Sequence, residues 1–230
     1  MTVFNIDTFD GHIILIDNGK KILLDTGCPY TIGIHDTFDF MGRQHRCFTS
    51  LAGIGINDIS KLMNYHVDFL MGMDLIGLYY LKIEYNSKTV TFSEKEIPFQ
   101  SICTTQIRNN MGAISVVLSV KNENVTLALD TGAKISYIGK NITHNEVLNG
   151  KKTDFNPMIG NFETPIYNIN ASIEGVVFPV KFGNLPDIYA SQMKMLGLDG
   201  AIGYDLFIAY NVYLDFQNMT MHIGKLSEQQ

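Results

Sequence analysis

Long runs of one kind of residue are missing from this chain. Its 17 basic residues never stand more than two together, and the net charge is −6. The sequence therefore has no basic run that could neutralise a phosphate backbone, and we expect no nucleic-acid partner. No apolar stretch approaches the length of a membrane span, so we expect no membrane partner. The three cysteines, an odd number without close spacing, predict neither a disulfide framework nor a thiolate zinc site.

The composition that remains is typical of a folded globular chain. Of 230 residues, 46% are hydrophobic and 17% are charged, enough for one large domain or two lobes of roughly 100 residues each. The first residues show no basic segment followed by an apolar one, so we expect no secretory signal and a cytoplasmic location. The six histidines have no metal-ligand spacing. We expect no metal, and surface or hydrogen-bonded positions for these histidines.

Two short segments end an apolar run in the same three residues. ILLDTG ends at Gly27 and LALDTG ends at Gly132, which places Asp25 and Asp130 105 positions apart (130 − 25). An ionised aspartate is rarely buried without a partner, and a single Asp-Thr-Gly is typical of a turn. The second copy favours another explanation, in which two carboxyls face each other and share a proton.

The repetition extends beyond these two segments. Each is preceded by an apolar hairpin, and Asn18-Gly19 is a strong turn signal in the first of them. A second block, residues 68–92, matches residues 199–223; each predicts a strand ending in glycine, a short helix and a hairpin. Short β-branched and aromatic runs between turn residues favour an all-β chain with a few short helices.

The two copies divide the chain into halves. We expect an N-terminal lobe over residues 1–104 and a C-terminal lobe over residues 105–230, which meet at a polar stretch without clear periodicity. Residues 57–66 predict a helix. Asp74 and Asp205, at the start of the two short repeated helices, are predicted to be helix caps.

Paired carboxyls at buried strand ends can carry out acid–base chemistry. Like charges about 3 Å apart cannot both ionise cheaply, so one pKa falls and the other rises. The ionised acid can take a proton from water while the protonated acid polarises a carbonyl, which hydrolyses an amide without metal, cofactor or covalent intermediate. Gly27 and Gly132 allow close approach and can donate their N–H groups to the carboxylates. The hydroxyls of Thr26 and Thr131 can bond across to the opposite loop.

The two Asp-Thr-Gly segments resemble those of the aspartic proteases, and most closely those of the retroviral (retropepsin-like) type. Each segment is followed later in the chain by two apolar residues and a glycine, which is Gly72 in the first half and Gly203 in the second, and this feature belongs to the same resemblance. The resemblance implies a bilobal, pseudo-twofold acid-protease fold of two retropepsin-like β-barrel lobes with short helices. Because both halves lie in one chain, it implies a monomer. It also implies an aspartic endopeptidase that hydrolyses a polypeptide substrate through a water activated by Asp25 and Asp130, with no cofactor.

Three smaller expectations concern residues near the two aspartates. Pepsin-like enzymes usually have a hydroxyl three residues after each catalytic aspartate, where this chain has Cys28 and Ala133. We therefore hypothesise a mildly acidic to neutral pH optimum. Cys28 is expected to be a small buried residue, with an oxidation switch as the alternative. Thr31 and Ser136, which are related by the repeat, are expected to support the two loops.

The second half has room for an additional hairpin. Asp130 and Gly203 are 73 positions apart, whereas Asp25 and Gly72 are 47 apart, a difference of 26. We place a flap that closes over the substrate in residues 157–175.

Turns are predicted within this flap at Gly160-Asn161 and at Thr164-Pro165. The tentative flap and substrate-binding residues are Gly160, Asn161, Phe162 and Tyr167. The shorter segment 39–55 of the first half is expected to form a reduced flap or none.

Two other functions stay open on the sequence. A fold of this type can lose its chemistry and keep peptide binding, so a catalytically silent peptide-binding or regulatory module is the alternative. A structural scaffold whose two acids merely pair is the third. Peptide cleavage by the wild type, compared with Asp25→Asn and Asp130→Asn, distinguishes the enzyme from both.

Overall fold

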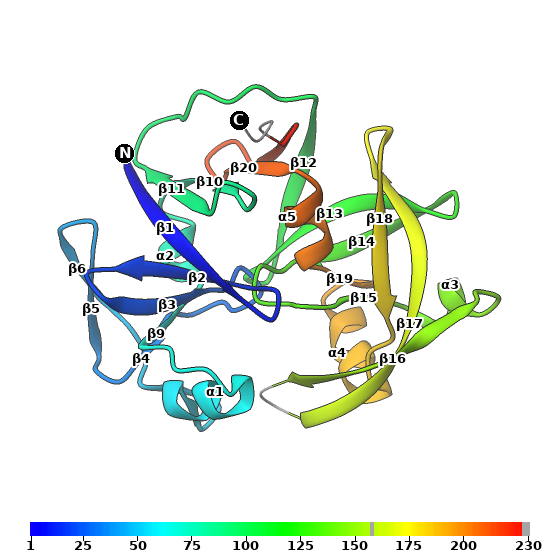
Figure 1. The fold of residues 1–230 in the computed structure, drawn as a ribbon, viewed down its shortest axis with the longest axis horizontal. Coiled ribbons are helices and arrows are strands. Elements are labelled where there is room, and N and C mark those ends of the chain that lie inside the picture. Colours follow the sequence, from blue (N-terminus) through cyan, green and yellow to red (C-terminus); the bar gives the residue numbers. More distant parts are fainter. Residues whose placement is uncertain (157–158, 227–230) are drawn as a thin grey trace.

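The structure, a computed structural model, describes residues 1–156 and 159–226 and is built mainly from β-strands (Figure 1). Its helices within these ranges are short, none longer than nine residues. The predicted all-β class with a few short helices is therefore confirmed. Within the described residues, no helix combines the length and the apolar character needed to cross a bilayer.

The elements up to residue 93 form the left and upper left of Figure 1. The strands here are β1 (Thr2–Phe9), β2 (His12–Asp17), β3 (Lys20–Leu24), β4 (Ile32–Gly33), β5 (Thr37–Phe40), β6 (Arg43–Arg46), β7 (Ser50–Leu51), β8 (Ile54–Gly55), β9 (Phe69–Met71), β10 (Tyr80–Glu84) and β11 (Thr89–Ser93). The helices are α1 (Ile56–Met63) and α2 (Met73–Ile76).

The elements from residue 103 onward form the rest of the molecule. The strands are β12 (Cys103–Asn110), β13 (Ala113–Val120), β14 (Glu123–Leu129), β15 (Ser136–Ile138), β16 (Leu148–Asn156), β17 (Gly160–Ile173), β18 (Val176–Gly183), β19 (Gly200–Ile202), β20 (Asn211–Asp215) and β21 (Thr220–Gly224). The helices are α3 (Lys140–Thr143), α4 (Asp187–Met195) and α5 (Tyr204–Ala209).

The same strand pairings occur around each Asp-Thr-Gly segment. In the first half β3 pairs parallel with β9, which pairs antiparallel with β4. In the second half β14 pairs parallel with β19, which pairs antiparallel with β15. Asp25 and Asp130 directly follow β3 and β14, and their N–H groups donate to Met71 (3.0 Å) and Ile202 (2.9 Å). Each carboxyl therefore lies where its strand leaves the sheet.

One antiparallel sheet joins the two halves. Its strands run in the order β1, β11, β10, β20, β21, β12, and the β10–β20 pair crosses from one half to the other. β12 then continues into a second pairing with β13. The expected boundary between residues 104 and 105 falls inside β12, and the segment without helix or strand before it covers residues 94–102.

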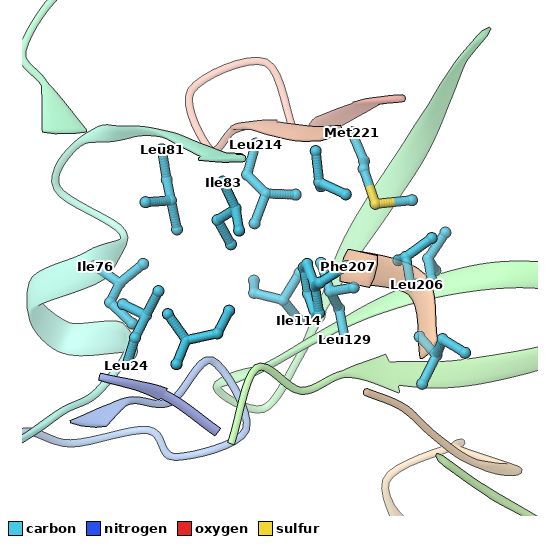
Figure 2. Packing of buried hydrophobic residues seen from close by; sticks show 14 of the residues in the cluster. Leu24, Ile76, Leu81, Ile83, Ile114, Leu129, Leu206, Phe207, Leu214 and Met221 are labelled. Carbon is cyan, nitrogen blue, oxygen red and sulfur yellow. The ribbon is translucent and has the colours of Figure 1, made fainter. Parts of the chain in front are cut away.

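The largest cluster of buried apolar side chains lies against this sheet and contains residues from both halves (Figure 2). Leu24 and Leu129, the residues before the two aspartates, are fully buried in it together with Leu81 and Leu214 from the joining sheet. Burying a leucine contributes roughly 1.5–3 kcal/mol to stability. The ends of the strands that lead to the two aspartates are thus anchored in a common core.

The helix predicted over residues 57–66 is confirmed as α1. Its N-cap is Gly55, whose N–H donates to the Asp58 carboxylate at 3.1 Å. The prediction that Asp74 and Asp205 cap helices is wrong, because the N-cap of α2 and of α5 is the glycine before each. Each aspartate instead accepts a hydrogen bond from the loop that follows an Asp-Thr-Gly segment.

Candidate active site

The structure brings Asp25 and Asp130 together at one cavity of about 250 Å³. The two carboxyls hydrogen-bond to each other. Each also accepts the N–H of the glycine two residues on: Gly27 donates to Asp25 and Gly132 donates to Asp130, both at 2.9 Å. Both aspartates are half-buried and line the cavity. Two acids far apart in the sequence therefore form one pair.

The absence of a side chain at Gly27 and Gly132 makes room for the opposite carboxyl. A Cβ on Gly27 would lie 2.5 Å from the carboxyl carbon of Asp130, and one on Gly132 would lie 2.7 Å from that of Asp25. Both distances are far inside van der Waals contact. Any side chain at either position would therefore push the opposite carboxyl away.

The threonines hold the two segments together by reciprocal hydrogen bonds. The Thr26 hydroxyl donates to the Leu129 carbonyl at 2.7 Å, and the Thr131 hydroxyl donates to the Leu24 carbonyl at 2.7 Å. Each threonine N–H also donates to the other hydroxyl at 3.0 Å. Both side chains are buried, so these bonds are shielded from water. The positions of the two carboxyls are coupled by four hydrogen bonds.

One further hydroxyl supports each Asp-Thr-Gly segment, from the chain that follows it. The Thr31 hydroxyl donates to Asp74 at 2.7 Å and accepts the N–H of Gly72 at 3.1 Å. The Ser136 hydroxyl donates to Asp205 at 3.0 Å and accepts the N–H of the glycine before α5 at 3.2 Å. These hydroxyls tie the loop after each aspartate to the start of a helix.

The environments of the two carboxyls give them different pKa values. Burial raises the pKa of Asp25 to about 6, partly offset by hydrogen bonds from Gly27, Cys28 and Asp130. Burial raises the pKa of Asp130 further, because the negative charge of Asp25 acts in the same direction. Between the two titrations the pair therefore holds one proton, with Asp25 ionised and Asp130 protonated.

The first half of the chain supplies an apolar wall of the cavity. This wall is formed by Leu23, Ile32, Leu51, Ile54, Ile59 and Leu70. Two of these residues, Leu51 and Ile54, belong to the short hairpin β7–β8, within the segment 39–55 for which a reduced flap or none was expected. This hairpin reaches the cavity, whereas the residues of the hairpin β5–β6 do not line it.

The second half supplies a longer hairpin, β16–β17; β17 lies within the segment 157–175 predicted for a flap, whereas β16 precedes that segment. Asp154, Phe155 and Asn156 of β16 and Phe162 of β17 line the cavity. Gly160 begins β17 with a left-handed φ of 76°, which suits glycine at the end of a turn. Residues 157 and 158, which begin the predicted flap segment, lie outside the described residues.

Other expectations for this segment differ from the structure. Asn161 is exposed on β17, and Tyr167 packs against the main core without lining the cavity. The turn predicted at Thr164-Pro165 is wrong, because both residues lie inside β17, opposite β16. The buried Thr164 hydroxyl donates to the carbonyl of Asn184 at 2.8 Å, which keeps this part of the strand extended.

A polar cluster beside the dyad was not expected from the sequence. The Tyr137 hydroxyl donates to the buried carboxylate of Asp154. Lys134 lies 3.7 Å from the same carboxylate and 2.8 Å from that of Asp10. These contacts link the strand β16 to the segment after Asp130 and to the tip of the β1–β2 hairpin. A sequence feature that could have indicated this cluster is Lys134, because the equivalent position of the first repeat is Pro29.

His12 contradicts the expectation that the histidines are exposed or fully hydrogen-bonded. It is buried at the edge of the cavity, and its ring bonds to the backbone of Gly132. Its Nδ1 has no hydrogen-bond partner within residues 1–156 and 159–226. Burial lowers the pKa of His12, and the nearby Asp154 offsets this only in part. The ring is therefore neutral at neutral pH.

Within residues 1–156 and 159–226, the cysteines and the remaining acids do not form a metal centre. In the described part of the chain, no group of three His, Cys, Asp or Glu side chains could hold a metal ion. Cys28 lines the cavity half-buried, donates to the Tyr30 carbonyl at 3.2 Å, and has its pKa raised by burial. A thiol in this environment is unreactive at neutral pH.

Comparisons with known proteins add little to this geometry. No protein-family model matches the chain, and no curated protein matches it by sequence. Among solved structures, the protease of simian foamy virus (mac) is similar over 36% of this chain and 94% of its own, with 15% identity and a TM-score of 0.27. A TM-score this low does not establish a family.

Proposed function

We propose that the protein is an aspartic endopeptidase with a two-lobed, pseudo-twofold acid-protease fold of retropepsin-like type in a single chain. One observation carries the proposal. Two carboxyls from equivalent strand ends hydrogen-bond to each other at a cavity, and burial raises the pKa of Asp130 further than that of Asp25, which favours a state with one proton shared by the pair. This is the state that general acid–base hydrolysis of an amide needs.

In the proposed mechanism the two acids have different roles. Ionised Asp25 takes a proton from a water molecule as its oxygen attacks the carbonyl carbon of the scissile amide. Asp130 gives its proton to the carbonyl oxygen. When the tetrahedral intermediate collapses, Asp25 returns its proton to the leaving nitrogen, the C–N bond breaks, and Asp130 recovers its proton from the hydroxyl that becomes the new carbonyl. The pair ends as it began, with one proton.

The surroundings of the pair suit an extended polypeptide. The hairpin β16–β17 lines the cavity, so a substrate strand can hydrogen-bond along β16. The apolar wall contributed by the first half favours an aliphatic or aromatic side chain next to the scissile bond. The lobes 1–104 and 105–230 each contribute one aspartate in this proposal, so a monomer suffices. The monomeric state and the cytoplasmic location stay predictions.

The experiment is peptide cleavage by matched variants. A random peptide library is incubated with the wild type, Asp25→Asn, Asp130→Asn and Asp39→Asn, and the products are identified by mass spectrometry. Asp39 is exposed on β5 and provides the same chemical change away from the cavity. We expect the two dyad variants to lose on the order of 10²- to 10⁴-fold in kcat. Asp39→Asn should retain wild-type activity.

The pH dependence provides a second readout. Because Asp25 must be ionised, kcat/KM should fall as the pH drops below about 6, and it should fall again at higher pH, when Asp130 loses its proton. Equal cleavage by all four proteins would refute the proposal that the protein is an aspartic endopeptidase. Saturable peptide binding by the wild type without cleavage would favour the silent binding module.

A further inference from the structure

A tyrosine that the sequence analysis did not single out lies in the same cavity as the two carboxyls. Tyr189 belongs to α4, is half-buried, and lines the cavity with Asp25, Asp130 and Asn156. Its ring packs against a cluster of buried apolar residues that includes Leu185. A phenol placed here is a polar group among apolar residues, in the same cavity as the two carboxyls.

The helix that carries Tyr189 is fixed at both ends. At its start, Asp187 pairs with Lys140 at 2.5 Å. Just beyond its end, the carbonyl of Leu196 accepts a hydrogen bond from the Asn110 side chain at 3.0 Å. These contacts and the packing of its ring hold Tyr189 at the cavity.

The phenol is in electrostatic contact with the dyad and remains a donor. Burial, and then the charges of Asp130 and Asp25, raise the pKa of Tyr189 to about 12. It therefore keeps its proton at neutral pH. A hydrogen bond with Asn156 on β16 acts in the opposite direction and lowers this pKa in part. A phenol O–H that lines this cavity can donate to a carbonyl oxygen bound there.

The first half of the chain has no equivalent hydroxyl. Ile54 and Leu185 both line the cavity, and they are 131 positions apart, the same offset that relates the two repeated blocks. By that offset α1 stands where α4 stands in the other half, yet α1 contributes Ile59 to the cavity, where α4 contributes Tyr189. The phenol is thus on one side only, and the charge that affects it most is that of Asp130.

We propose that Tyr189 is a third catalytic residue, whose O–H donates to the carbonyl oxygen of the scissile amide beside Asp130 and stabilises the negative charge that develops there. The inference rests on the proposed endopeptidase function. It assigns the carbonyl oxygen of the substrate to the α4 side and the attacking water to Asp25. It also couples the flap to catalysis, because Asn156 orients the phenol. A donor aimed at the developing oxyanion stabilises the transition state more than the substrate.

The test is Tyr189→Phe, which keeps the ring and removes only the hydroxyl. On a peptide that the wild type cleaves, we expect kcat to fall on the order of 10²-fold with KM changed by less than about 3-fold. The matched control is Tyr210→Phe, which removes a hydroxyl that donates to the Val177 carbonyl at 3.0 Å and does not line the cavity. It should keep wild-type kcat. Asn156→Ala should give a smaller loss than Tyr189→Phe.

A binding measurement separates this role from packing. Two inhibitors of the same sequence are compared, one with a hydroxyethylene unit in place of the scissile amide and one without its hydroxyl. Tyr189→Phe should weaken the first by about 10-fold or more and leave the second unchanged.

The outcomes separate this inference from the function on which it rests. If Asp25→Asn abolishes cleavage but Tyr189→Phe keeps kcat within about 3-fold, or weakens both inhibitors equally, the role of Tyr189 is refuted and the endopeptidase stands. If the wild type cleaves nothing, both are refuted.

Discussion

The two carboxyls should make this protein less stable as the pH rises, and the double variant Asp25→Asn/Asp130→Asn should remove that effect. Each asparagine can keep the glycine hydrogen bond, because its side-chain oxygen accepts the N–H of Gly27 or Gly132 as the carboxylate does. The substitution therefore changes the charge and the proton binding of the pair more than its packing. The quantity to measure is the free energy of unfolding as a function of pH.

The magnitude follows from the pKa of Asp25. Burial raises it from 3.8 to about 6, so the unfolded chain loses this proton at a lower pH than the folded chain. Stability is then lost as the pH rises from about 4 to about 6. At about 1.4 kcal/mol per pKa unit, the loss is about 3 kcal/mol. Asp130, whose pKa is raised further, adds to the loss with the same sign at higher pH.

Urea denaturation near pH 4 and near pH 7 measures this directly. The stability of the double variant minus that of the wild type should increase by at least about 3 kcal/mol between the two pH values. Asp39→Asn, with its exposed carboxyl, should show no comparable change. A difference that stays constant within about 1 kcal/mol, or that shrinks with pH, would mean that the two carboxyls do not pay the desolvation cost described here.

Two further substitutions test the contacts around the pair. Thr131→Val removes the hydroxyl that bonds to the Leu24 carbonyl and accepts the Thr26 N–H, and should cost on the order of 2 kcal/mol in urea denaturation, whereas Thr131→Ser should cost much less. If valine and serine behave alike, the reciprocal bonds contribute nothing measurable. Tyr137→Phe leaves the buried Asp154 without its phenolic donor, so it should cost roughly 1–3 kcal/mol and speed amide hydrogen exchange along β16. Unchanged amide hydrogen exchange in β16 would show that this contact does not hold the hairpin β16–β17 in place.

Part of the site could be anticipated because it is local and repeated. Asp25 and Asp130 follow apolar strands and precede a glycine, and these short-range features are legible in one sequence. The roles of Thr31 and Ser136 as supports were likewise suggested by their equivalent places in the repeat. Their partners were not, since both hydroxyls bond to carboxylates more than 40 residues away.

Other residues of the site could not be found in this way because they have no repeated counterpart. Tyr189 and Asp154 belong to segments where the two halves differ, and they reach the cavity only through the packing of α4 and the pairing of β16 with β17. The false turn at Thr164-Pro165 has a similar cause. Local turn preference was overridden by strand pairing and by the buried bond from Thr164 to Asn184.

By itself, then, the sequence determined an all-β chain with two repeated segments and an acid at the end of one strand in each, because strand periodicity and turn chemistry act over a few residues. Tertiary structure alone decided which side chains surround those acids, how deeply they are desolvated, and that one wall of the cavity is aliphatic while the other carries a phenol. Burial and charge depend on neighbours from distant parts of the chain, and these set the pKa values on which the proposed chemistry depends.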